Sequence, residues 1–180
     1  MFLQKLRTLI GHNINGRKRV KPCLLPNKKL AEISKILVVA DMTENDSTAA
    51  INNLKQKAKL LCPKADITFI CFYLPNAHKE TLISYNGCEY ITPKDFSFFF
   101  RIRNENLRNY ITREYDMAMF LTSTHNPYLE FIGAYIRARL KVGKRSNDDG
   151  QFNFMIDSKS DSMLQLSNDI VSNLKMVFGD

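Results

Sequence analysis

Short apolar runs and helix-patterned segments alternate along most of this chain, and that alternation restricts the possible folds more than any other feature. Residues 36–40 form a continuous apolar run rich in β-branched side chains, which is typical of a strand buried on both faces of a parallel sheet. Similar runs occur at 67–73 and 116–122, and helix-patterned segments separate them. The order predicts an α/β protein with a Rossmann-like three-layer fold and a mostly parallel sheet.

Capping residues mark the expected starts of two helices. Asp46 or Ser47 is suited to cap the helix that follows the first strand, and Ser160 or Asp161 is suited to cap the last helix. A further helix is expected near 105–113, where apolar residues recur at helical spacing. Helices in these places would connect successive strands of the sheet.

Residues 92–100 combine a helix-start signal with several aromatic residues. Thr92 is a favourable cap and Pro93 a favourable first helical residue, so a helix is expected here. Such an aromatic helical face packs in a core more often than it stacks on nucleic-acid bases, and we expect the core role. The aromatic residues on or beside this face are Phe96, Phe98, Phe99 and Phe100.

The last two expected strands, 140–142 and 151–157, are joined by a short link. Residues 143–150 are too few for a helical crossover, so the two strands are either antiparallel or not adjacent. Asp149 followed by Gly150 is suited to a tight turn, which favours the antiparallel arrangement. We therefore expect an antiparallel strand at the edge of the sheet.

The net charge of +8 is concentrated at one end of the 180-residue chain. Residues 1–35 contain nine Lys or Arg and one Glu, whereas residues 36–180 contain 17 side chains of each sign. We expect a basic N-terminal arm at 1–35, which includes a short amphipathic helix, and a single α/β domain at 36–180. Such asymmetry favours a polyanionic partner, either nucleic acid or an anionic membrane surface.

Six cations of the arm are clustered, and we expect them to contact phosphate groups. The favoured partner is RNA or a ribonucleoprotein such as the ribosome. The alternative is a solvated leader that only increases solubility. The six residues are Arg17, Lys18, Arg19, Lys21, Lys28 and Lys29.

The predicted location of the protein is the cytoplasm. No apolar run approaches the roughly 18 residues that a membrane-spanning helix needs. Lys5 and Arg7 interrupt the apolar stretch that a secretion signal would require. The first 31 residues are free of acids, basic and amphipathic, so organelle import is expected instead if the source is eukaryotic. Whether these residues are a retained arm or a cleaved leader stays open.

Polar residues at the ends of two expected strands are candidates for ligand binding. Asp41 follows the first strand, and the loop after the third contains Thr122, Ser123 and His125. In parallel α/β sheets, ligands bind beyond the carboxyl ends of the strands, and helix N-termini favour anions. The alternative, which we favour, is that these side chains only terminate strands and cap helices. Asp157 would lie at the opposite edge if its strand is antiparallel.

The sequence contains none of the motifs that identify a common catalytic or cofactor site. The four cysteines include no C-x-x-C pair, and the three histidines form no H-E-x-x-H pattern. There is no G-x-G-x-x-G motif, which makes a dinucleotide site improbable. We therefore expect no metal, no cofactor and no catalytic residues, and we favour a protein that is not an enzyme.

A series of elements resembles one known family. The pattern is an aromatic-Asp-hydrophobic strand at 115–122, a helix, a Lys-hydrophobic-Gly strand at 141–143 and a hydrophobic strand ending in Ile156-Asp157. It resembles an uncharacterised family of small Bacteroidota proteins, known only as a domain of unknown function. The resemblance implies a Rossmann-like fold in a bacterial cytoplasmic protein, and it brings no assigned activity.

The stretch 115–145 is also similar to the N-terminal half of heptosyltransferase-like glycosyltransferases. The nucleotide-sugar-binding half of those enzymes has no counterpart in this sequence. Three functional interpretations follow. The favoured one is a non-catalytic module that binds RNA through its basic arm. The alternatives are a small-molecule, nucleotide-binding or degenerate transferase domain, and a protein attached to a membrane surface through the helix expected at 2–10.

Overall fold

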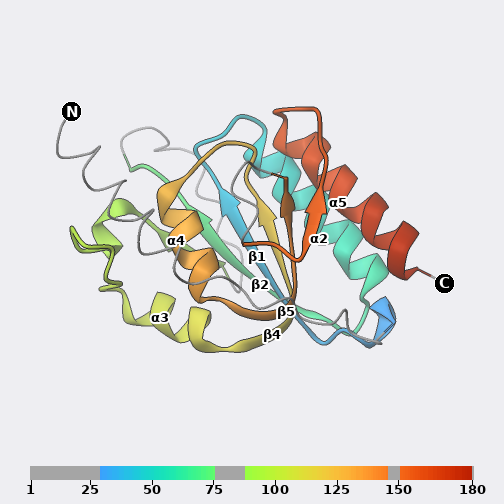
Figure 1. Ribbon diagram of the computed structural model, residues 1–180, viewed down its shortest axis with the longest axis horizontal. Helices are drawn as coiled ribbons and strands as arrows, with labels where there is room; N and C mark the ends of the chain where they lie inside the picture. The colour runs from blue at the N-terminus through green and yellow to red at the C-terminus, as the bar shows by residue number, and fades with distance from the viewer. Residues whose placement is uncertain (1–28, 76–87, 146–150, 180) are drawn as a thin grey trace.

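A computed structural model describes residues 29–75, 88–145 and 151–179, in which helices cover both faces of one sheet (Figure 1). The strands are β1 (Lys35–Asp41), β2 (Asp66–Phe72), β3 (Cys88–Ile91), β4 (Glu114–Leu121), β5 (Arg137–Lys144) and β6 (Phe154–Ile156). The α-helices are α2 (Ser47–Leu61), α3 (Glu105–Thr112), α4 (Pro127–Tyr135) and α5 (Met163–Phe178). Two short 3-10 turns are η1 (Leu30–Glu32) and η2 (Pro93–Asp95).

The six strands lie in the order β3-β2-β1-β4-β5-β6, and every neighbouring pair is parallel. This is the doubly wound order of Rossmann-type sheets, in which the direction of winding reverses between β1 and β4. The predicted α/β class and Rossmann-like three-layer architecture are confirmed. The reversal leaves the carboxyl ends of β1 and β4 side by side, with no crossover helix above them.

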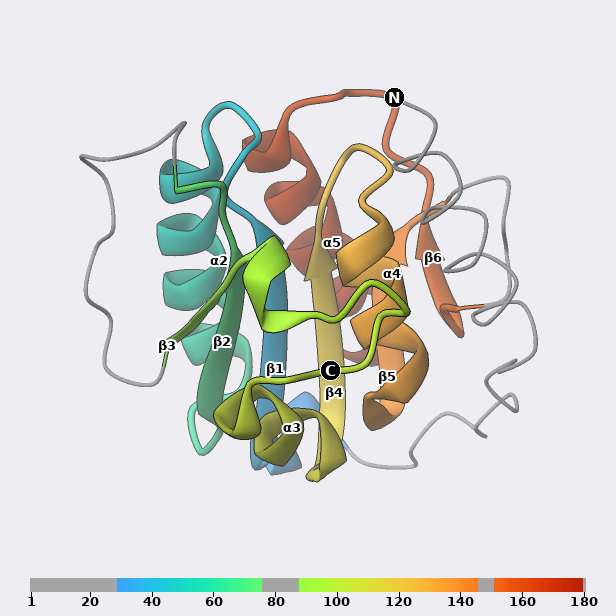
Figure 2. The same cartoon turned by 90° about the vertical axis from the view of Figure 1, so that its left-hand side faces the viewer.

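Strand β1 is apolar from Ile36 to Ala40 because it contributes to two cores. Ile36 and Val38 belong to the core beneath α2 and α5, while Leu37 and Val39 belong to the core beneath α3 and α4. Successive side chains of a strand point to opposite faces, so a strand covered on both sides must be continuously apolar. Figure 2 shows the two helical layers on either side of the sheet.

The packed body begins before the boundary that we expected at residue 36. Leu30 in η1 and Ile33 are buried in the core beneath α2 and α5. The side chain of Asp116 on β4 accepts bonds from the Ser34 backbone and hydroxyl. Residues 30–34 are therefore tied to the sheet.

None of the helices in the described part of the chain has the length and apolar content needed to span a bilayer.

The predicted antiparallel edge strand is wrong, because β6 pairs parallel to β5. Only three register pairs form, from Val142 with Phe154 to Lys144 with Ile156, so the chain returns along β5 by only about 10 Å. Residues 145–153 are enough to cover that distance without a helical crossover. Asn153 lies along β5 and exchanges bonds with the Lys141 backbone, which holds the returning chain beside it.

The predicted helix at 92–100 is also wrong. Thr92 does act as a cap, and a capping box with Asp95 is complete, but the helical turn ends at Asp95. Phe96 then bridges Ile102 in an antiparallel pair, so the chain forms a short hairpin. Of the four phenylalanines only Phe96 and Phe100 are buried in the core.

The helix predicted near 105–113 is confirmed as α3, capped by Asn104. The cap of α2 is Asp46, one of the two residues predicted for it, although the Asp46 side chain makes no hydrogen bond to that helix. Its carboxylate instead accepts bonds from the Ser162 hydroxyl and the Leu164 backbone, at the start of α5. Ser162 caps α5, so the predicted caps for that helix fall one or two residues early. Asp46 thereby joins the first turns of two neighbouring helices.

Candidate functional site

The residues predicted to bind a ligand come together where the sheet reverses its winding. Ala40 on β1 pairs with Leu121 on β4. Asp41 and Thr122 are the next residues of the two chains, so they lie side by side at the carboxyl edge of the sheet. Ser123 lies in the same loop before α4. The carboxyl edge at this reversal is where open α/β sheets bind ligands. We call the loops 42–46 and 122–126 together the switch-point loops.

Asp41 is buried and is fully used in holding the two loops. Only 2% of its surface is exposed. One carboxylate oxygen accepts bonds from the Thr43 backbone and hydroxyl, at 2.9 and 2.6 Å, and the other accepts a bond from the Asn126 amide at 2.6 Å. Asn126 in turn caps α4 by accepting bonds from the Tyr128 and Leu129 backbone. Asp41 therefore orients the cap of α4.

Glu44, which the sequence analysis did not single out, occupies the centre of the switch-point loops. Its carboxylate accepts bonds from the Ser123 backbone at 2.9 and 3.1 Å and from the Thr124 backbone at 3.1 Å. The Thr122, Ser123 and Thr124 hydroxyls also donate to it. A lone acid in a polar loop gives no signal of this role, because its partners lie about 80 residues further along the chain.

These contacts leave the switch-point loops poorly suited to an anionic ligand. The backbone donors of Ser123, Thr124, Tyr128 and Leu129 point to acceptors of the same chain. The acceptors include two carboxylates, Asp41 and Glu44, whose negative charge opposes a phosphate. An anion would have to displace the Glu44 side chain to reach the Ser123 and Thr124 donors.

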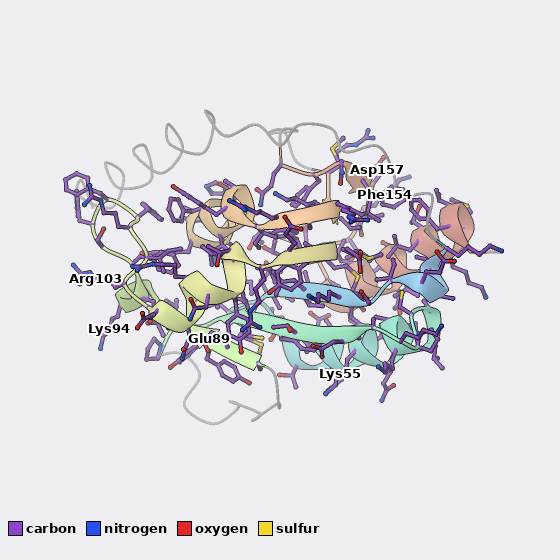
Figure 3. The ribbon with its side chains drawn as sticks, turned by 90° about the horizontal axis from the view of Figure 1, so that it is seen from below. Lys55, Glu89, Lys94, Arg103, Phe154 and Asp157 are labelled. Atoms are coloured by element: carbon purple, nitrogen blue, oxygen red, sulfur yellow. The ribbon has the colours of Figure 1, made fainter. Side chains whose placement is uncertain are left out.

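The His125 side chain contacts the start of α4 rather than the carboxylates of the site. Its Nδ1 atom contacts the Glu130 carboxylate, and about half of the His125 side chain is exposed. Asp157, labelled in Figure 3, is exposed. Because β6 is parallel to β5, Asp157 lies at the carboxyl edge of the sheet, as Asp41 does, rather than at the opposite edge. Strands β4 and β5 separate the two acids. Ligand binding by Asp41, Thr122, Ser123 and His125 stays a prediction.

The body also contains a buried amine and a pair of neighbouring thiols, both of which are groups that can take part in chemistry. Lys141 on β5 is 2% exposed, and its ammonium group donates to the Gly133 carbonyl in the last turn of α4 at 2.9 Å. Burial lowers the pKa of Lys141 to about 8. The sulfur atoms of Cys71 on β2 and Cys88 on β3 are 3.3 Å apart. That contact raises the pKa of Cys71 and lowers the pKa of Cys88.

The residues of the predicted phosphate-binding cluster lie outside the described part of the chain, apart from Lys29. That residue precedes η1 and is exposed. Within residues 29–75, 88–145 and 151–179, no group of three His, Cys, Asp or Glu side chains is arranged to hold a metal ion. The predicted phosphate contacts of the arm therefore stay predictions. The other members of the cluster are Arg17, Lys18, Arg19, Lys21 and Lys28.

Comparison with known protein families gives a match that spans most of the chain. A family of unknown function, DUF6913, matches residues 13–177. The chain belongs to this family. No curated protein and no solved structure matches the chain. The expectation of an uncharacterised domain is thereby confirmed, while the Bacteroidota origin and the likeness to glycosyltransferases stay predictions. The region shared with DUF6913 includes Arg17, Lys18 and Arg19, and it leaves out residues 2–10.

Proposed function

We propose that this DUF6913 protein is a non-catalytic RNA-binding module. Its basic N-terminal segment contacts the phosphates of RNA or of a ribonucleoprotein such as the ribosome, and its α/β body is the scaffold. The observation that carries the proposal is the segregation of charge: residues 1–35 contain nine cations and one acid, and residues 36–180 are neutral. Clustered Lys and Arg side chains bind polyanions by releasing condensed counterions.

Two further observations support this proposal over its alternatives. The family match begins at residue 13, so the basic cluster belongs to the region shared by the family, whereas the apolar helix expected at 2–10 does not. The switch-point loops are filled by the Glu44 carboxylate, so the place where this fold usually holds a phosphate has its donors already in use. The basic segment is therefore the better candidate for contact with an anion.

Salt dependence of RNA binding tests the proposal. Binding of a labelled single-stranded oligoadenylate is measured by fluorescence anisotropy at several salt concentrations. We expect affinity to fall with a log-log slope near −3 if about four cations touch the strand, at about −0.7 per contact. Replacing Arg17, Lys18 and Arg19 together by Ala should flatten the slope by about two. The melting temperature should hardly change, because exposed charges contribute little to stability.

The membrane alternative predicts a different result in the same experiment. Vesicles of phosphatidylcholine and phosphatidylserine replace the RNA, and Leu6→Asp is compared with the triple basic variant. A membrane-bound protein would lose vesicle binding in both variants, whereas RNA binding should respond only to the basic residues. If the wild-type chain binds RNA no more tightly than a chain lacking residues 1–28, the proposal is wrong.

A second candidate function is the binding of a small molecule or nucleotide at the switch-point loops. The observation that favours it is the convergence of Asp41, Thr122 and Ser123 at the reversal of the sheet, where such ligands bind in related folds. Because Glu44 holds the donors of that loop, an anionic ligand would bind only by displacing it. The degenerate-transferase hypothesis requires the same displacement.

A further inference from the structure

A short hairpin at 96–102 projects from the α3 and α4 side of the molecule. The pair of Phe96 and Ile102 is its base. The Ser97 backbone donates to the Arg101 carbonyl at 2.8 Å, and the Arg101 backbone donates to the Ser97 hydroxyl at 3.0 Å. These bonds close the turn, so Phe98 and Phe99 stand at its end in a defined conformation.

Phe100 anchors this turn in the core. Its ring is 1% exposed and lies 5.3 Å from the Tyr128 ring and 5.5 Å from the Phe131 ring, both on α4. Its backbone is left-handed, with φ of 58°, which is unfavourable for an aromatic residue. The chain adopts this conformation here because it turns the Phe100 ring inward just after Phe98 and Phe99.

Phe98 and Phe99 are the exposed aromatic residues of the described part of the chain. Their side chains are 39% and 60% exposed, and their rings meet edge to face at 5.3 Å. An edge-to-face pair leaves ring faces accessible to another flat group. The core role expected for all four phenylalanines therefore holds only for Phe96 and Phe100.

Three exposed cations lie on this hairpin and at its base. Arg101 and Arg103 flank Ile102 on the returning strand of the hairpin, so they leave it on the same side, and both are exposed. The Arg103 backbone donates to the Asp95 carbonyl at 2.8 Å, which brings Arg103 beside exposed Lys94, as Figure 3 shows. None of the three forms an ion pair with a described residue.

One acid, Asp95, lies between these cations, which outnumber it three to one. The Asp95 carboxylate accepts bonds from the Thr92 backbone and hydroxyl and from the Asn104 amide. It is therefore committed to the capping box and to the cap of α3. We call the five side chains the aromatic tip: Lys94, Phe98, Phe99, Arg101 and Arg103.

We propose that the aromatic tip is a second RNA-binding surface, specific for single strands. Unpaired bases stack on Phe98 and Phe99, and the adjoining phosphates contact Arg101, Arg103 and Lys94. This inference rests on the proposed function, in which RNA is the partner, and names the form of RNA recognised. Exposed rings beside unpaired cations complement a ligand that has both flat aromatic groups and negative charges. The basic segment binds phosphates alone, whereas stacking on Phe98 and Phe99 adds binding that salt weakens little.

Replacement of both exposed rings tests this inference. The variant Phe98→Ala/Phe99→Ala should bind single-stranded oligoadenylate about tenfold more weakly than wild type, at both low and high salt, with an unchanged salt slope. Binding of a blunt-ended duplex RNA, whose bases are all paired and stacked on each other, should be unchanged. Phe99→Tyr should retain the wild-type affinity because it keeps the ring. Arg101→Ala/Arg103→Ala should flatten the slope by about 1.4.

The matched control is Leu60→Ala/Met176→Ala, on α2 and α5. These apolar side chains are 82% and 75% exposed, so their removal takes away exposed apolar surface far from the tip, and RNA binding should not change. An unchanged affinity of the Phe98→Ala/Phe99→Ala variant, while the triple Arg17, Lys18 and Arg19 variant loses binding, would overturn this inference and leave the proposed function intact. If the Phe98→Ala/Phe99→Ala variant lost vesicle binding but kept RNA binding, this inference would also be overturned, in favour of a contact between the tip and a membrane. Failure of wild type to bind any RNA would refute both.

Discussion

Two buried charged side chains show how single residues set the packing of the body. Asp41 is surrounded by three donors, so its charge is matched by hydrogen bonds. Lys141 has the single Gly133 carbonyl as a hydrogen-bond acceptor, in the last turn of α4. A cation is favourable at that end of a helix, because the last carbonyls lack partners and the helix dipole is negative there. Lys141 therefore stabilises the end of α4, while its own charge is poorly solvated.

The stability of the protein should rise with pH as Lys141 loses its proton. Burial lowers the folded-state pKa to about 8 from the ordinary value of 10.5. Between those values the unfolded chain binds more protons at this position than the folded chain, so the free energy of unfolding increases with pH. For one proton the slope approaches about 1.4 kcal/mol per pH unit. Urea denaturation at pH 7 and pH 9.5 measures it.

Lys141→Met provides the control for this prediction. The variant keeps a long apolar side chain and cannot titrate, so the stability difference between wild type and variant should shift in favour of wild type as the pH rises. Other groups that titrate in this range affect both proteins equally and cancel in the difference. A difference that stays constant from pH 7 to pH 9.5 would show that Lys141 has an ordinary pKa.

At the scale of elements, Glu44 fastens the β1–α2 loop to the β4–α4 loop. Its carboxylate accepts bonds from three consecutive residues of the second loop, Thr122, Ser123 and Thr124. The two loops carry the starts of helices on opposite faces of the sheet, α2 and α4. Glu44 therefore connects the two helical layers across the edge of the sheet.

Removal of this carboxylate should loosen the connection. We expect Glu44→Ala to lower the free energy of unfolding by about 2 kcal/mol, because it leaves the Ser123 and Thr124 donors without their charged acceptor. Glu44→Gln should cost less, about 1 kcal/mol, because the amide oxygen keeps part of the bonding. Thermal melts of both variants, with and without inorganic phosphate and a nucleoside diphosphate, provide the measurement.

The same melts decide between the two candidate functions at this site. If the switch-point loops have a purely structural role, neither anion should stabilise wild type or Glu44→Ala. Stabilisation of wild type by the nucleoside diphosphate would support the ligand-binding alternative. Stabilisation of Glu44→Ala alone would mean that the loop is a competent anion site that Glu44 blocks.

At the scale of the whole molecule, the described body should fold without residues 1–28. Its two cores are complete from Leu30 onward, and the buried residues Leu30 and Ile33 close the core beneath α2 and α5. A chain of residues 29–180 should unfold cooperatively in urea with nearly the stability of the full chain. A chain of residues 36–180 should lose about 3–5 kcal/mol, because two buried apolar side chains are removed.

The comparison of the two truncations locates the boundary of the folded body. A non-cooperative melt for residues 29–180 would mean that the basic segment is part of the core, which would contradict its assignment as an RNA-binding arm. Equal stability of the two truncations would contradict the packing of Leu30 and Ile33.

The positions of most strands and helices were determined by the sequence alone, because the spacing of apolar residues is a local property. The continuous apolar run at 36–40 requires burial on both faces, and that requirement leads to a parallel sheet between helical layers. The loops after β1 and β4 could also be predicted as candidate ligand positions. They directly follow buried strands in the sequence, and the carboxyl ends of parallel strands lie at one edge of the sheet. The concentration of positive charge in residues 1–35 is likewise independent of the fold.

Only the tertiary structure decided features that depend on contacts between distant residues. The direction of β6 depends on how Asn153 bonds to β5, and the role of Glu44 depends on Ser123 and Thr124, far along the chain. The exposure of Phe98 and Phe99 has the same origin. Local spacing predicts a helix there, but burying Phe100 against α4 stabilises a hairpin in its place. Local periodicity specifies the elements, whereas the free energy of long-range packing selects their register, their direction and the side chains left at the surface.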